Sequence, residues 1–147
     1  MRVDCPLCQA EGGALVWCDQ RLRVIHAQEV GFPAFYRVVW QAHVPEFSDL
    51  PEVDRAHCMQ AVARVEQVLR AQLQPTKVNL AALGNQVPHL HWHVIARFEW
   101  DSHFPAPVWG AVARVPDPER LAALVAQQPQ VHAALRQQLE QWSKSAA

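Results

Sequence analysis

The chain has 147 residues, half of them apolar, and a formal net charge of −1 at pH 7. This length suits one domain with its own hydrophobic core. No basic run supports polynucleotide binding, and no apolar stretch is long enough to cross a bilayer. We therefore expect neither a nucleic-acid partner nor a membrane partner.

The N-terminal residues lack the apolar segment of a signal peptide, so we expect a cytoplasmic, reducing location. There, four cysteines favour free thiols or metal binding over disulfides. Cys5 and Cys8 form a Cys-x-x-Cys pair, which has the spacing of a zinc knuckle but supplies only half of its ligands. Cys18 and Cys58 have no such partner, and we expect both to pack as small hydrophobic residues.

Three segments in the first third of the chain have the composition of β-strands. They cover residues 14–19, 21–27 and 36–42, and the third is rich in β-branched and aromatic side chains. Gly31-Phe32-Pro33 is a turn signal before the third segment.

A long helix is predicted over residues 50–73. Asp49-Leu50-Pro51-Glu52 has the pattern of a capping box with proline in the first turn. The apolar residues that follow recur every three or four positions, which is typical of one buried helix face: Val53, Met59, Val62, Val65, Leu69 and Leu73.

Two more strands are predicted at residues 76–83 and 87–98. A short turn at Gly84-Asn85 separates them, so we expect an antiparallel pair. The order of strands, one long helix, two strands and terminal helices indicates an α+β fold around an antiparallel sheet.

The last part of the chain is predicted to be a loop followed by helices. Residues 99–116 are rich in proline and aromatic residues and suit a loop. A helix begins at Asp117, is interrupted at Pro129 and ends before a frayed tail over residues 143–147. We predict one domain in two parts, residues 1–115 and a C-terminal helical extension over residues 116–147.

Three histidines, His89, His91 and His93, alternate with apolar residues in the second strand of the predicted pair. On a strand, this period places all three imidazoles on one face, with neighbours roughly 7 Å apart. One histidine there is usually structural and two often share a metal, but three in register exceed what either role requires. We favour a catalytic site and keep the structural and metal-only roles as alternatives.

The segment His89–Ile95 resembles the signature of the histidine triad family, in which three histidines alternate with apolar residues. Other segments that resemble this family are Cys5-Pro6-Leu7-Cys8, Val38 to Val44, Val78-Asn79, Gly84-Asn85-Gln86-Val87 and Pro107-Val108-Trp109. The resemblance covers residues 5–110 and points to bacterial zinc-knuckle members that are similar to diadenosine tetraphosphate hydrolases. It implies a HIT-like fold, with one long helix packed on a five-stranded antiparallel sheet, and a homodimer.

The resemblance also implies hydrolysis or transfer of nucleotidyl groups from dinucleoside polyphosphates or nucleoside phosphoramidates. His91 would attack the α-phosphorus, and water would cleave the resulting nucleotidyl-histidine. A neutral imidazole is nucleophilic near pH 7 when one nitrogen is bare and the other bonds a fixed acceptor. His93 would donate to a phosphoryl oxygen or the leaving group, while Asn79, Asn85 and Gln86 would bind the substrate. This scheme requires no catalytic metal.

A structural metal site is implied in the same way. In zinc-containing members, the Cys-x-x-Cys pair is completed by the histidine after the apolar strand and by the first triad histidine. The corresponding ligands in this sequence are Cys5, Cys8, His43 and His89, a closed Cys₂His₂ set typical of structural zinc. The alternative is that Cys5 and Cys8 are free thiols in a turn and that His43 only forms hydrogen bonds with its neighbours.

Three positions depart from the family pattern. Phe35 stands where a histidine is usual, and Gln41 stands where a lysine is usual. Only Glu29 lies near the place of an aspartate that holds the ribose. Because of these departures, we keep as an alternative hypothesis a zinc-stabilised nucleotide-binding protein with little or no turnover. A metal-dependent hydrolase that uses two triad histidines as ligands is a third hypothesis.

Overall fold

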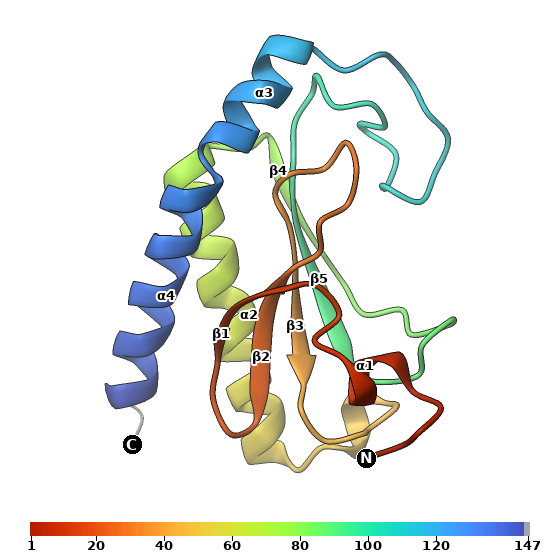
Figure 1. The fold of residues 1–147 in the computed structure, drawn as a ribbon, viewed down its shortest axis with the longest axis vertical. Helices are drawn as coiled ribbons and strands as arrows, with labels where there is room; N and C mark the ends of the chain where they lie inside the picture. The colour runs from red at the N-terminus through yellow and green to blue at the C-terminus, as the bar shows by residue number, and fades with distance from the viewer. Residues whose placement is uncertain (146–147) are drawn as a thin grey trace.

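The protein, described over residues 1–145 in a computed structural model, is built on one five-stranded antiparallel sheet. The strand order is β1-β2-β3-β5-β4, and α2 and α4 lie side by side along one face (Figure 1). The predicted α+β fold is therefore confirmed. In chain order the elements are α1 (Pro6–Gln9), β1 (Ala14–Cys18), β2 (Leu22–His26), β3 (Phe35–Trp40), the 3-10 helix η1 (Phe47–Asp49), α2 (Glu52–Leu73), β4 (Lys77–Ala81), β5 (His91–Arg97), α3 (Pro118–Ala126) and α4 (Gln128–Ser145).

The main hydrophobic core lies between the sheet and the two long helices. Tyr36, Val38 and Val94 belong to it on the sheet side, so the alternate residues of β3 and β5 face away from the helices. On α2, Val62, Val65 and Leu69 of the predicted stripe are buried, Met59 and Leu73 are partly buried against the core, and Val53 in the first turn is 65% exposed. The buried positions of α2 are Cys58, Ala61, Val62, Val65, Val68 and Leu69.

The start of α2 differs from the prediction. Its N-cap is Pro51, and no side chain caps the helix. Asp49 instead closes a capping box one turn earlier, at η1, where its carboxylate accepts a hydrogen bond of 3.3 Å from the backbone N–H of Glu46. The proline separates η1 from α2, so the carboxylate serves the element before the proline.

The connection between β4 and β5 is longer than the predicted turn. The two strands pair antiparallel as expected, but β5 begins only at His91. The prediction that His89 shares the strand is therefore wrong. The backbone turns at this point because the N–H of His89 donates to the carbonyl of Val87 and the N–H of Leu90 donates to the carbonyl of Val44.

The two cysteines outside the N-terminal pair have different environments. Cys58 is buried as predicted, but Cys18 is exposed, so the prediction that it packs in the core is wrong. Cys18 is the last residue of the edge strand β1, where a side chain finds no covering element.

The C-terminal part follows the predicted loop and helices. Residues 98–117 contain no helix or strand, and α3 and α4 meet at Gln127, with Pro129 in the first turn of α4. Helix α4 continues to Ser145, so residues 143–145 are helical; residues 146–147 of the predicted tail lie outside the described part. The division at residue 115 stays a prediction. Helix α4 adds four buried side chains to the main core: Val131, Leu135, Leu139 and Trp142.

Within residues 1–145, every helix is too short or too polar to cross a membrane.

Candidate functional site

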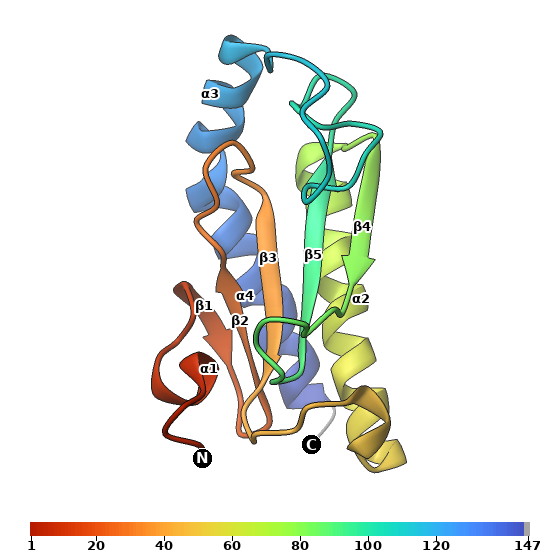
Figure 2. The same cartoon turned by 90° about the vertical axis from the view of Figure 1, so that its right-hand side faces the viewer.

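The face of the sheet opposite α2 and α4 carries a cavity of about 470 Å³. This is the face beside α1 and the loop between β4 and β5 (Figure 2). The cavity brings together residues from β3, β5 and two loops, among them Arg37, Asn85, Gln86, His91, His93 and Trp109. Four of the predicted catalytic and substrate-binding residues therefore line one space.

The tautomer of His91 is set by the chain itself. Its Nδ1 lies 2.6 Å from the backbone carbonyl oxygen of His89. A carbonyl oxygen only accepts, so Nδ1 carries the proton and Nε2 keeps its lone pair. Since His91 lines the cavity, it has the arrangement that a nucleophilic imidazole requires.

His93 has the opposite arrangement. The Nε of Arg37 donates to Nδ1 of His93 at 3.3 Å, so the proton of the neutral ring lies on Nε2. The rings of His91 and His93 tilt together, with centroids 4.9 Å apart at 83°, instead of the roughly 7 Å of a straight strand. One bare nitrogen and one N–H donor are thus neighbours on the cavity wall.

Both rings are held neutral near pH 7. Burial lowers the pKa of His91, and the Arg37 charge adds to this effect, while the hydrogen bond to the His89 carbonyl opposes it. Burial lowers the pKa of His93 to about 3, and His91 and Arg37 act in the same direction. A neutral His91 keeps its lone pair, and a neutral His93 donates without positive charge.

This low pKa predicts a dependence of stability on pH. An unfolded histidine, with a pKa of about 6.5, takes up a proton that folded His93 refuses until about pH 3. The free energy of unfolding should therefore fall as the pH drops from about 6.5 towards 3. Between pH 7 and 4.5, denaturant unfolding should show wild type losing roughly 1 to 2 kcal/mol more than His93→Asn. If wild type and His93→Asn lose the same free energy of unfolding, His93 does not have the lowered pKa, since the other acid-sensitive groups are common to both proteins.

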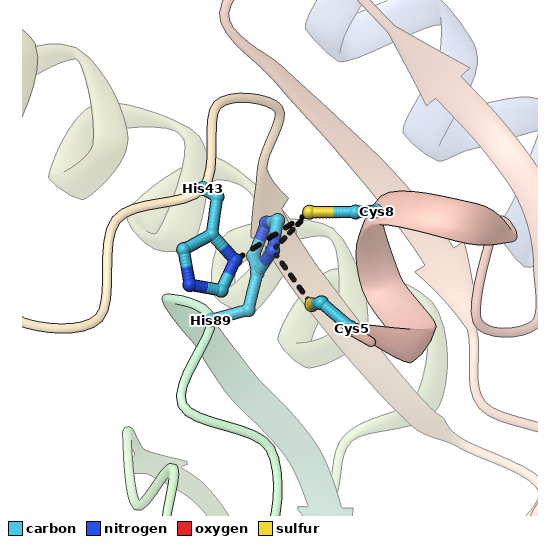
Figure 3. Close-up of side chains that lie close together, drawn as sticks. All are labelled: Cys5, Cys8, His43 and His89. Atoms are coloured by element: carbon cyan, nitrogen blue, oxygen red, sulfur yellow. Dashed lines mark hydrogen bonds between the residues drawn. The ribbon is translucent and has the colours of Figure 1, made fainter. Parts of the chain in front are cut away.

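A second cluster lies beside the cavity and consists of Cys5, Cys8, His43 and His89 (Figure 3). One ligand atom from each residue lies within 4.8 Å of the other three. Nδ1 of His89 is 3.4 Å from Sγ of Cys5 and 3.5 Å from Sγ of Cys8, and Nδ1 of His43 is 3.4 Å from Sγ of Cys8. The predicted four residues thus converge and can hold a metal ion.

The orientation of His89 suits a ligand. Its Nε2 donates to the carbonyl oxygen of Trp40 at 2.6 Å, which leaves Nδ1 bare and directed at the cysteines. Burial is the main cause that lowers the pKa of His89, so the ring is neutral as metal binding requires. The carbonyl of the same residue orients His91, so the cluster and the nucleophile position share one backbone segment.

A buried arginine holds the N-terminal segment in place. Nη2 of Arg23 donates to the carbonyl oxygens of Leu7 and Ala10, at 2.7 and 3.1 Å. Its Nη1 donates to Oε1 of Gln41 at 2.7 Å. Gln41, at the position of the usual family lysine, therefore serves as a hydrogen-bond acceptor for Arg23. A lysine there would instead place a second cation beside Arg23.

Asn79 lies apart from the other predicted substrate-binding residues. It does not line the cavity, and its Oδ1 accepts a hydrogen bond of 2.8 Å from Nη1 of buried Arg97. Arg97 is also paired with Asp101, whose carboxylate accepts from the backbone of His103 and Phe104. The predicted contact of Asn79 with substrate stays a prediction; what the structure shows is a link to the 98–117 loop.

Sequence reasoning missed Arg37 as a site residue and did not place Trp109. The ring of Trp109 lies 5.0 Å from that of His93 and 6.4 Å from that of Phe35. Phe35 itself packs edge-on against His93 at 5.5 Å, so an apolar contact occupies the place of the usual histidine. The signal for Arg37 was a single charge inside an otherwise apolar strand.

Comparison with known proteins agrees with this fold. The family model described as HIT domain matches residues 12–100. A histidine triad protein from Bradyrhizobium japonicum is 29% identical, with a TM-score of 0.70 over 87% of this chain and 91% of that chain. One from Marinobacter aquaeolei is 28% identical, with a TM-score of 0.70 over 89% and 91%. One from Sinorhizobium meliloti is 28% identical, with a TM-score of 0.68 over 85% and 88%. A search of curated proteins finds no match.

Proposed function

Because the chain belongs to the histidine triad family, we propose that it hydrolyses or transfers nucleotidyl groups, with His91 as nucleophile. The substrates are dinucleoside polyphosphates or nucleoside phosphoramidates, cleaved at the α-phosphorus. The observation that carries this proposal is the hydrogen bond from Nδ1 of His91 to the His89 carbonyl, which leaves Nε2 bare at the cavity wall.

The reaction divides into two displacements. Nε2 of His91 attacks phosphorus, forms a P–N bond and displaces the leaving group; water then breaks the P–N bond and releases the nucleotide. Covalent catalysis of this kind replaces one difficult step by two easier ones. The Nε2–H of His93 donates to a phosphoryl or leaving-group oxygen, and the side-chain amides of Asn85 and Gln86 bind the substrate from the loop.

We propose that the metal held by Cys5, Cys8, His43 and His89 is a structural zinc. Tetrahedral zinc with thiolate and imidazole ligands requires S···N distances of about 3.5 Å. Three of the S···N separations in the cluster are 3.4 to 3.5 Å and fit this geometry. Zinc would join the N-terminal segment to the backbone that orients His91; it would take no part in the displacement.

The remaining parts of the proposal concern partners and location. The partner is a small nucleotide, and we expect no polynucleotide, in line with the absence of a basic run in the sequence. A homodimer, implied by the family resemblance, and a cytoplasmic location both stay predictions.

The test is to trap the intermediate. The protein is mixed with diadenosine tetraphosphate or adenosine 5′-phosphoramidate, quenched without acid and measured by intact-mass spectrometry, while released AMP is followed in parallel. We expect an adenylyl mass increment that peptide mapping locates on His91. An increment on another residue refutes the nucleophile assignment. Saturable nucleotide binding with neither adduct nor AMP supports the nucleotide-binding protein without turnover.

A further inference from the structure

The cavity contains a cation that the mechanism above does not use. Arg37 is the one arginine or lysine among the cavity-lining residues of the described chain, and its side chain is 20% exposed. It lies on β3 directly opposite His93, whereas His91 is opposite Val39. The positive charge is therefore on the His93 side of the nucleophile.

Most N–H donors of this guanidinium have no hydrogen-bond acceptor among residues 1–145. A guanidinium has five N–H groups. One donates to Nδ1 of His93, and one on Nη2 lies 3.5 Å from Oε1 of Glu29. The other N–H groups have no protein acceptor within residues 1–145, and they belong to a side chain that lines the cavity.

The charge is also poorly compensated. Glu29 is half exposed, so its ion pair with Arg37 is weak. The face of the Phe35 ring lies 5.1 Å below the guanidinium and supplies only a cation–π contact. Burial lowers the pKa of Arg37, although Glu29 opposes this effect. A half-buried cation with free donors is an arrangement that an anion completes.

We propose that Arg37 is a catalytic residue that binds phosphate oxygens of the leaving group and so favours substrates whose leaving group departs as an anion. This inference rests on the proposed function and narrows it from nucleotidyl transfer in general to phosphoanhydrides.

The chemical step balances without another reactant. The lone pair of His91 Nε2 forms the P–N bond, and the electron pair of the broken P–O bond goes to the leaving phosphate. The negative charge that develops on this oxygen meets the guanidinium and the Nε2–H of His93. Water then attacks phosphorus, the P–N electron pair returns to Nε2, and the displaced proton of water is released.

An amine leaving group gains less from this arrangement. An amine departs only after it takes up a proton, and a positive charge beside His93 opposes the protonated imidazole that would supply one. A phosphate leaves as an anion and needs neutralisation instead, which a guanidinium fork provides in bidentate form.

The test compares two substrates that both release AMP, diadenosine tetraphosphate and adenosine 5′-phosphoramidate. Arg37→Gln is expected to lower kcat/KM for the anhydride about 100-fold, as loss of a transition-state donor does, and to affect the phosphoramidate much less. Arg37→Lys, which keeps the charge, should recover part of the anhydride rate. Arg120→Gln is the matched control, since Arg120 is exposed on α3, outside the cavity. Equal losses on both substrates, or no loss on either, would overturn the proposal.

A binding measurement separates this inference from the proposed function. The probes are the non-cleavable α,β-methylene ADP and adenosine, titrated calorimetrically into His91→Asn protein with and without Arg37→Gln. Loss of the arginine should weaken binding of the methylene analogue about tenfold or more and leave adenosine unchanged. If wild type turns over neither substrate, the proposed function fails, while an unchanged Kd for the analogue overturns the role of Arg37 on its own.

Discussion

Replacing His91 with asparagine is expected to lower kcat for nucleotide cleavage on the order of 10⁴-fold or more, as loss of a catalytic nucleophile does. The amide of asparagine is close in size to imidazole and can still donate to the His89 carbonyl, so the loop and strand should keep their geometry. Because the lone pair of Nε2 is lost and the cavity is kept, Kd for AMP should change only a few-fold. Steady-state kinetics and calorimetric titration measure the two quantities.

His103→Asn is the matched control, because His103 lies in the 98–117 loop, with its ring tilted against that of Phe32, and does not line the cavity. It should keep wild-type kcat. If His91→Asn retains activity within tenfold of wild type, His91 is not the nucleophile, and direct attack by water becomes the better mechanism.

Replacing Cys5 with serine is expected to abolish binding of the proposed structural zinc and to lower the free energy of unfolding by roughly 4 kcal/mol, since loss of a metal is among the largest single-residue effects. In a chain of this size, such a loss corresponds to a fall in Tm of about 10 °C. Cys5 is buried against Leu7, Ile25 and Val39, so the substitution would also weaken the packing of the N-terminal segment on the sheet. Elemental analysis gives the metal content, and thermal unfolding gives the Tm.

Cys18→Ser makes the same chemical change at an exposed thiol outside the cluster, and it should leave both quantities unchanged. Removal of the metal from wild type by a chelator should be slow and should lower Tm before it lowers kcat. An immediate loss of activity with an unchanged fold would instead support a metal-dependent hydrolase.

The parts of the fold that depend on local pattern were predictable. The alternation in β5 and the three- and four-residue spacing in α2 are properties of neighbouring residues, and the strand and helix lie within the ranges that these patterns predict. Boundaries were less predictable, because partners distant in sequence decide them. The start of α2 depends on a carboxylate already used at η1, and the start of β5 depends on a hydrogen bond to Val44.

The same difference applies to the site. Residue types and spacing alone singled out the histidine triad and the Cys-x-x-Cys pair, and the family resemblance connected the pair to His43 and His89. Only the tertiary structure gives His89 a different place from His91 and His93, since its ring faces the cysteines while its carbonyl orients His91. Only the register of β3 against β5 brings Arg37 to His93. Residue types and their spacing indicate which chemistry each residue can perform. The direction of hydrogen bonds and the proximity of charges depend instead on strands that are distant in sequence.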